Sequence, residues 1–274
     1  MLQLKRPRKP RGFEAAVRSA REAVEAAVAC GNEPVFEPVW RRYKAEFAQA
    51  QHHKCGYCEI KAFAGEPGDV EHYHPKAAVW ALRDDPSTWG REVPHLSNVE
   101  GRRHRVLSSR GYWWLAYEWK NYLLACDRCN SAWKASFFPV EEASRALPPD
   151  PRRPEMPLLL SPFGRRKPGR HLRFSDLGQV ESVPSSPFGF ETIRTCGLDR
   201  ESLRDAREEK ARKTYDLLQR LSSADGAKAK EHMRDLVELG RVDYAHAGMV
   251  RAIFEDVVGT RWRLLEDAVG SAGP

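Results

Sequence analysis

The spacing of apolar residues predicts helices in the first part of the chain. Between residues 12 and 31, apolar side chains recur every three or four positions, as on one face of a helix, and Gly31 is suited to its end. A second helix is expected from about Pro38, where the aromatic residues Trp40 and Phe47 fall on one face. Two helices should therefore precede Cys55, the first residue of a C-x-x-C pair.

The middle of the chain shows weaker periodicity. Residues 55–76 are expected to contain a short hairpin, because residues 65–69 combine glycine, proline and aspartate in a pattern typical of turns. Residues 77–110 are polar and irregular, which indicates an insertion. The aromatic and apolar run from 111 to 125 predicts a helical turn, and a short helix should follow Cys129.

A proline-rich stretch and a helical stretch complete the pattern. Prolines make residues 146–190 mostly irregular, with short strands expected around 158–160 and 171–183. Residues 199–269 predict three helices that are separated at glycines. We thus expect an α+β fold that is mostly helical. Its four regions would be an N-terminal helical region (1–52), a core with an insertion (53–140), a proline-rich region with short strands (141–190) and a C-terminal helical region (191–274).

The overall charge of the chain is positive. Its 274 residues carry a formal net charge of +7, and the isoelectric point is about 9.1. This excess raises the expectation of a polyanionic partner, because cationic surfaces release counterions from phosphates. Each basic cluster, at residues 5–11, 102–105 and 165–167, is as readily explained as a solvated surface. No apolar run suits a membrane helix or a signal core, so we expect a cytoplasmic protein.

Four of the six cysteines form two C-x-x-C pairs, Cys55 with Cys58 and Cys126 with Cys129. Zinc prefers four thiolates in a tetrahedron, and each C-x-x-C turn presents two of them. Redox-active pairs and buried free thiols are the alternatives, but two pairs of identical spacing favour a structural zinc site. The long segment between the pairs should then form one functional unit.

Between the cysteine pairs, Glu71 and His72 stand side by side on an expected strand. Because successive strand side chains point to opposite faces, Glu71 could hold a cation while His72 takes a proton from water, or strand twist could bring both to one phosphate. Alone, such a dipeptide is better explained as a surface pair. Its context changes this interpretation, because Asn130 directly follows the last cysteine and its amide oxygen could share a hard cation with Glu71.

These residues resemble the HNH endonuclease family in its ββα-metal form with a zinc-stabilising cysteine quartet. The matched elements are Glu71-His72 with Pro75, then Asn121-Tyr122-Leu123, then Cys126-x-x-Cys129-Asn130-x-x-x-Lys134. The resemblance implies that His72 is the general base and that Asn121 holds the loop that orients it. It also implies that Glu71 and Asn130 bind a catalytic divalent cation such as magnesium. Many members have aspartate at the position of Glu71 and histidine at the position of Asn130, so this chain departs from the common pattern at both metal-binding positions.

A longer resemblance is to the PtuB-like HNH nuclease subunits of Septu-type anti-phage defence systems. It is carried by the runs from Tyr112 to Cys126, Glu71 to Lys76 and Pro157 to Pro162, and by the basic start of the chain. In that family the nuclease pairs with an ABC-type ATPase subunit, and some members occur with retrons. The resemblance therefore implies the nuclease effector of a defence system that acts with an ATPase partner.

Several residues are weaker candidates. His74, Lys76 and Lys134 could contact phosphate. The aromatic run 112–119 could stack on bases, although core packing explains it better. A competing hypothesis is a zinc-stabilised nucleic-acid or protein-binding subunit without catalysis, which fits the cysteines and the charge equally well. The expected substrate is nucleic acid, with DNA favoured over RNA.

Overall fold

The computed structural model describes residues 1–62, 68–82 and 102–270. Most of the predicted turn at residues 65–69 and the central part of the predicted insertion, residues 83–101, lie outside the described residues. Helices and strands are both present, which confirms the expected α+β class.

Both predicted N-terminal helices are confirmed. They are α1 (Phe13–Ala29) and a 3₁₀ turn, η1 (Val39–Tyr43), that continues into α2 (Lys44–Ala50). The rings of Phe13 and Phe47 pack against the ring of Trp119, with centroids 5.1 and 4.5 Å away. Such aromatic pairs add to the burial of apolar area. The aromatic run that contains Trp119 therefore lies in the core at this residue, as core packing predicted.

The central sheet pairs two segments that are far apart in the sequence. β1 (Gly68–His72) runs antiparallel to β4 (Tyr122–Cys126). The predicted local hairpin within residues 55–76 would give β1 a neighbouring strand as its partner, but its partner in the structure is β4. The turn residues ahead of β1 indicated a change of direction, but the fully buried apolar run of β4 is the strand partner. The register places Gly68 opposite Cys126, so the pairing draws the two cysteine pairs together.

The ends of the predicted insertion form strands. β2 (Val79–Leu82) pairs with β3 (Arg103–Ser108) in an antiparallel ribbon with irregular register. The prediction of an irregular stretch over residues 77–110 is thus wrong at both ends. The predicted helical turn and short helix are confirmed. They are the 3₁₀ turns η3 (Trp113–Leu115) and η4 (Trp119–Asn121), and the π-helical segment η5 (Arg128–Lys134).

One of the two strand predictions in the proline-rich region is confirmed. β5 (Leu172–Phe174) and β6 (Val180–Ser182) form a hairpin. Its turn contains Gly178, whose φ of +73° suits glycine. In place of the strand expected around residues 158–160, the chain forms an isolated antiparallel bridge between Pro157 and Val140, and the Leu158 N–H donates to the Pro139 carbonyl at 3.0 Å. Prolines flank this stretch, and proline lacks the backbone N–H that a strand needs.

The C-terminal region contains more helices than the sequence predicted. The described helices there are α4 (Pro187–Cys196), α5 (Glu201–Ser223), α6 (Gly226–Leu239), α7 (Ala247–Val258) and α8 (Trp262–Gly270). Four helices therefore replace the three expected over residues 199–269, because Gly259 at φ +70° ends α7. The sequence prediction also missed α4, which Ser186 caps by accepting a hydrogen bond from the Gly189 N–H.

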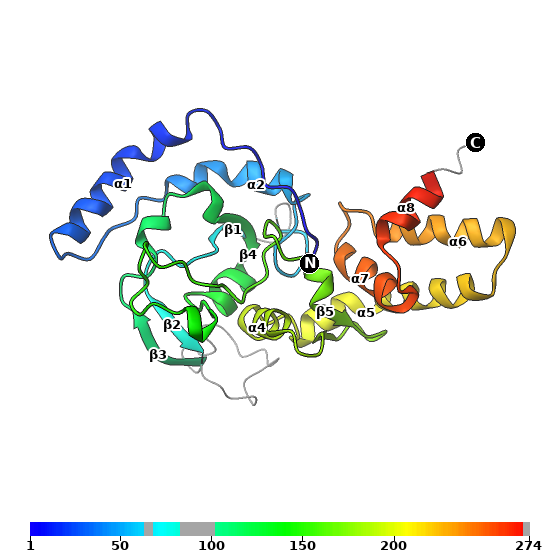
Figure 1. The fold of residues 1–274 in the computed structure, drawn as a ribbon. Helices are drawn as coiled ribbons and strands as arrows, with labels where there is room; N and C mark the ends of the chain where they lie inside the picture. The colour runs from blue at the N-terminus through cyan, green and yellow to red at the C-terminus, as the bar shows by residue number, and fades with distance from the viewer. Residues whose placement is uncertain (63–67, 83–101, 271–274) are drawn as a thin grey trace.

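The elements gather into two lobes (Figure 1). The first lobe holds α1, α2 and β1 to β4, and the second holds α5 to α8, with α4 and β5 between them. Gly197 ends α4 at φ +57°, and a side chain there would come within 2.0 Å of the Trp133 ring. The Arg102 guanidinium lies 4.6 Å from that ring and donates to the Trp133 carbonyl at 2.9 Å. These contacts hold η5 against α4.

Candidate functional site

The four predicted cysteine ligands meet in one buried cluster. They are Cys55, Cys58, Cys126 and Cys129, and none is in a disulfide. All four Sγ atoms lie within 4.8 Å of one another, and those of Cys58 and Cys126 are 3.8 Å apart. Sulfur atoms that lie about 2.3 Å from a tetrahedral zinc ion are about 3.8 Å apart, so the cluster could hold a metal ion such as zinc. Within the described ranges, no other group of three or more cysteine, histidine or acidic side chains could do so.

The thiols of this cluster have pKa shifts in opposite directions. Burial, and then hydrogen bonds with the neighbouring sulfur atoms, raises the pKa of the Cys55 thiol well above its ordinary value. Burial also acts to raise the pKa of the Cys58 thiol, but hydrogen bonds with the other three sulfur atoms and the charge of Arg200 outweigh it and hold that pKa well below its ordinary value. A divalent metal ion binds thiolates and releases thiol protons, so metal binding and folding of this region should be coupled.

The side chain of Gln51 forms hydrogen bonds that hold the segment at the first cysteine pair, Cys55 and Cys58, against β4. Its Nε2 donates to the carbonyl oxygens of Lys54 (3.0 Å) and Leu124 (2.8 Å), and its Oε1 accepts from the Leu124 N–H (2.8 Å). The Gly56 N–H donates to the same Leu124 carbonyl at 2.8 Å. Sequence reasoning missed Gln51, because no local pattern signals a contact between α2 and a strand so far along the chain.

Arg200 places positive charge beside the cysteine cluster. Its side chain is buried, and one guanidinium nitrogen lies 3.6 Å from Cys129 Sγ. The same nitrogen donates to the carbonyl oxygens of Cys196 (3.3 Å) and Gly197 (2.8 Å) at the end of α4. A zinc ion with four thiolates carries net negative charge, so a buried arginine is a suitable neighbour. Sequence reasoning missed this residue as well.

A cleft of about 280 Å³ brings together most of the predicted catalytic residues. Its lining includes Glu71 and His72 from β1, Lys76 from the loop after β1, and Asn130 from η5. Asn130 reaches this position because the neighbouring Cys129 fixes the start of η5 at the cysteine cluster. The side chains of Glu71 and His72 leave β1 on opposite faces, yet both residues line this cleft.

The ring of His72 has a fixed orientation. Its Nε2 lies 2.9 Å from the carbonyl oxygen of Ala116, and the ring packs edge-on against Trp40 and Tyr122, with centroids 4.5 and 5.1 Å away. Because a carbonyl oxygen only accepts, Nε2 carries the hydrogen, and Nδ1 of the neutral ring keeps its lone pair. Burial, and then the charge of Lys76, lowers the pKa of His72 well below its ordinary value, so the ring is neutral at pH 7.

Glu71 is paired with a buried lysine. Its Oε1 lies 2.5 Å from Lys134 Nζ, and both side chains are buried. Lys134 also donates to the carbonyl oxygen of His72 at 3.0 Å. Burial raises the pKa of Glu71 above its ordinary value, although the Lys134 ammonium acts in the opposite direction. Lys134 thus balances the carboxylate and fixes the backbone of the neighbouring histidine.

Asn121 joins the two segments that position His72. Its Oδ1 accepts from the His74 N–H (2.7 Å) and lies 3.1 Å from His74 Nδ1. Its Nδ2 donates to the carbonyl oxygens of His74 and Leu115, both at 3.0 Å. His74 follows His72 by two residues, and Leu115 precedes Ala116, whose carbonyl fixes the His72 ring. Asn121 does not line the cleft. Its contacts reach His72 only through the neighbouring backbone.

The three predicted phosphate contacts lie in different surroundings. Lys76 lines the cleft, and its ammonium lies 4.7 Å from the ring centroid of Trp40. Lys134 is buried in the ion pair with Glu71. His74 packs between aromatic rings outside the cleft lining, where burial lowers its pKa to about 4. The structure brings only the first of the three to the surface of the cleft.

Sequence reasoning missed a second carboxylate and two cations beside the cleft. A cavity of about 560 Å³ adjoins it and shares Arg41, Asp69 and Asn130 among its lining residues. Asp69 lies two residues before Glu71 and so shares its face of β1. Arg41 pairs with Asp69 at 3.3 Å, and Lys44 extends the basic wall from the start of α2. The alternation along β1 could have revealed Asp69, but the basic wall depends on the tertiary fold.

Comparison with known proteins supports the PtuB-like resemblance. The chain is 34% identical over 175 residues to the Septu protein PtuB of Bacillus mycoides (strain KBAB4). The matched part covers 63% of this chain and 51% of PtuB, so the chain spans about half the length of the relative it matches. No protein-family model matches the chain. The predicted resemblance to PtuB is confirmed. In the described part of the chain, no helix is both long and apolar enough to cross a membrane.

Proposed function

We propose that this protein is a metal-dependent endonuclease that hydrolyses phosphodiester bonds in nucleic acid, with an HNH-type ββα-metal site. The observation that carries the proposal is the cleft that His72, Glu71 and Asn130 border together. An oriented neutral imidazole, a carboxylate and an amide oxygen are the groups that such a hydrolysis needs. The order of elements, a strand pair followed by η5, is compatible with this type of site.

Glu71 and Asn130 would hold the catalytic cation. One carboxylate and one amide oxygen form a sparse ligand set, which suits magnesium because this ion keeps several waters and also uses substrate phosphates. A divalent cation supplies stabilisation of the negative charge that develops on the phosphate and on the leaving oxygen. Until substrate binds, the ion pair with Lys134 offsets the negative charge of the Glu71 carboxylate.

The residues of this chain would transfer the proton and bind the substrate. Nδ1 of His72 accepts a proton from the attacking water, while the Nε2–H bond to Ala116 keeps the ring in place. Lys76 and Arg41 border the cleft and bind the sugar-phosphate backbone without reading bases. The products then carry 5′ phosphates, and DNA is the favoured substrate over RNA. With zinc bound, the cysteine cluster fixes the position of η5 relative to β1.

We further propose that the nuclease is the effector of an anti-phage defence system of the Septu type or a retron-associated one. The similarity to PtuB supports this role. An ABC-type ATPase is then the expected partner subunit, and the defence role places the protein in the cytoplasm. Joint purification of this chain with an ABC-type ATPase, if one is encoded beside its gene, tests the partnership.

A cleavage assay tests the proposed activity directly. Purified zinc-loaded protein is incubated with plasmid DNA, and separately with labelled RNA, with and without added magnesium. Cation-dependent nicking or fragmentation is expected, with fragments that carry 5′ phosphates. If the protein binds nucleic acid but leaves it intact with magnesium, manganese and the ATPase partner all present, the non-catalytic binding subunit is the better explanation.

Replacing Asn121 with alanine should slow cleavage without removing any group from the cleft. The substitution breaks the bonds to His74 and Leu115, and unpaired buried groups cost about 1–3 kcal/mol each. We expect a lower melting temperature and a lower kcat, because the Ala116 carbonyl no longer holds the His72 ring firmly. Calorimetry and single-turnover cleavage measure the two effects.

Asn121→Asp is a second probe of these contacts. It keeps the oxygen that accepts from the His74 N–H but places a buried carboxylate oxygen against the carbonyl oxygens of His74 and Leu115, so it should lower stability at least as much as alanine. A normal cleavage rate in Asn121→Ala protein at a temperature where it is folded would contradict the positioning role.

A further inference from the structure

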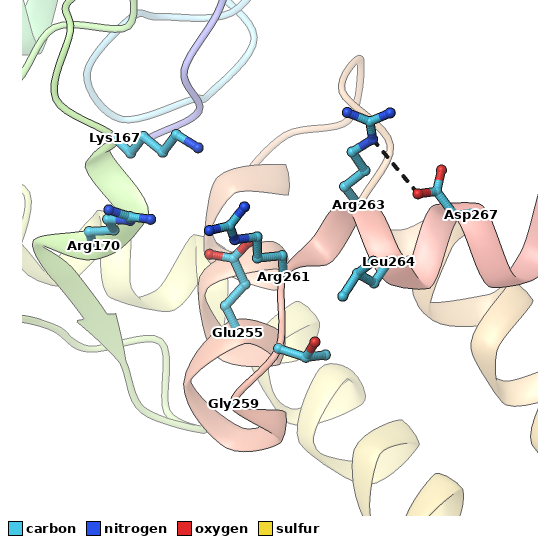
Figure 2. Close-up of a pocket in the computed structure, with 9 residues that line it drawn as sticks. Lys167, Arg170, Glu255, Gly259, Arg261, Arg263, Leu264 and Asp267 are labelled. Carbon is cyan, nitrogen blue, oxygen red and sulfur yellow. Dashed lines mark ion pairs between the residues drawn. The ribbon is translucent and has the colours of Figure 1, made fainter.

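A large cavity on the second lobe has four basic and two acidic side chains in its lining. Its volume is about 840 Å³, and it lies between the segment that contains η7 (Pro168–Arg170) and the loop that joins α7 to α8 (Figure 2). Its charged lining residues are Lys167, Arg170, Arg261, Arg263, Glu255 and Asp267. Figure 2 shows Lys167 and Arg170 on one wall and Arg261 and Arg263 across from them.

Both carboxylates of this cavity are engaged in local contacts. Glu255 Oε1 accepts from the Trp262 N–H at 3.0 Å, and Asp267 pairs with Arg263 at 3.7 Å. In the part of the chain that the structure describes, Lys167, Arg170 and Arg261 have no carboxylate within ion-pair distance. Four cations and two carboxylates line the cavity, so its lining carries an excess of two positive charges.

The form of the cavity indicates the class of its ligand. Pockets for small molecules are mostly apolar and bury most of the ligand. Here the basic side chains of Lys167, Arg170 and Arg261 are exposed. The positive charge also continues beyond the cavity, because Arg165 and Arg166 directly precede Lys167. An open basic surface that extends past its cavity suits a long polyanion, whose binding gains from counterion release.

We infer that this cavity is a second contact for the sugar-phosphate backbone of nucleic acid, separate from the cleft. The inference rests on the proposed function for the choice of nucleic acid as ligand. The cleft is lined by residues of β1 and the basic cavity by residues of α7 and α8. Figure 1 shows β1 in the first lobe and α7 and α8 in the second. A substrate long enough to reach both should bind more tightly than one that fills the cleft alone.

Charge reversal in a binding assay tests this inference. The double variant Arg170→Glu and Arg261→Glu is prepared in full-length His72→Ala protein, so that binding is measured without cleavage. Fluorescence anisotropy gives the Kd for duplex DNA of about four helical turns over a salt series. We expect the Kd to rise about tenfold or more, and the dependence of log Kd on log salt to weaken by about two phosphate contacts.

The matched control carries the same change of net charge elsewhere. Arg18→Glu with Arg234→Glu alters two exposed residues of α1 and α6. If both double variants lose affinity equally, net charge alone explains the loss and the site is wrong. An unchanged Kd in the cavity variant also overturns it and leaves an acidic protein surface as the class of ligand. Absence of nuclease activity would refute the proposed function without affecting this binding result.

Discussion

Replacing Cys55 with serine is expected to abolish stoichiometric zinc binding and cooperative folding of the first lobe. Serine is a poor ligand for zinc, and the three remaining thiols cannot close a tetrahedron. Structural zinc supplies roughly 10 kcal/mol or more of apparent binding free energy in small zinc domains, which is comparable to the whole stability of a domain. Metal analysis and thermal unfolding measure the loss, and a strong chelator should reproduce it in the unaltered protein.

Cys30 provides the matched control for this substitution. It is exposed at the end of α1 and lies outside the cluster, so Cys30→Ser should leave zinc content and melting temperature unchanged. Arg200→Met is a second probe, because it removes the charge beside Cys129 and keeps most of the volume. A folded Cys55→Ser protein with normal melting temperature would mean that the cluster is an ordinary buried group of thiols.

The cysteine cluster could be predicted from the sequence because its motifs are local. Each C-x-x-C turn is a short-range feature, and Asn130 follows the last cysteine directly, so their proximity needs no knowledge of the tertiary fold. The helices of the N-terminal region were predictable for the same reason, because a helix repeats within a few residues.

Long-range pairing explains what the sequence could not predict. β1 pairs with β4 across some fifty residues, and no periodicity in either strand identifies the other as its partner. The bond of His72 to Ala116, the four contacts of Asn121 and the clamp of Gln51 all depend on that pairing. The sequence therefore predicted most of the side chains that meet at the cleft, but not the contacts that orient them.

The structure also changes the interpretation of the predicted phosphate contacts. The sequence placed three basic or imidazole groups near the motif without distinguishing them. Burial separates them, because Lys134 neutralises Glu71 while Lys76 reaches the cleft. Under the proposed function, substrate binding would depend on Lys76 and Arg41, and for a long substrate also on the basic cavity of the second lobe.

Substitution of His72 should have the largest effect on cleavage. Loss of a general base lowers rates by about 10²- to 10⁴-fold, so His72→Ala is expected to reduce single-turnover cleavage by that factor. The ring is buried between Trp40 and Tyr122, so alanine also leaves a cavity and lowers stability. His72→Gln separates the two effects, because its amide can donate to the Ala116 carbonyl and fill most of the space, yet cannot accept the proton as imidazole does.

Imidazole rescue distinguishes a base from a merely structural residue. The cavity in His72→Ala protein borders the cleft, so added imidazole should restore part of the cleavage rate there, whereas His72→Gln protein should respond little because its side chain fills the space. His104→Ala, an exposed histidine of β3, is the control and should cleave normally. Zinc content and melting temperature are measured in every variant. Full cleavage by folded His72→Gln protein would remove His72 from the mechanism and leave Glu71 and Asn130 without a proton acceptor in the cleft.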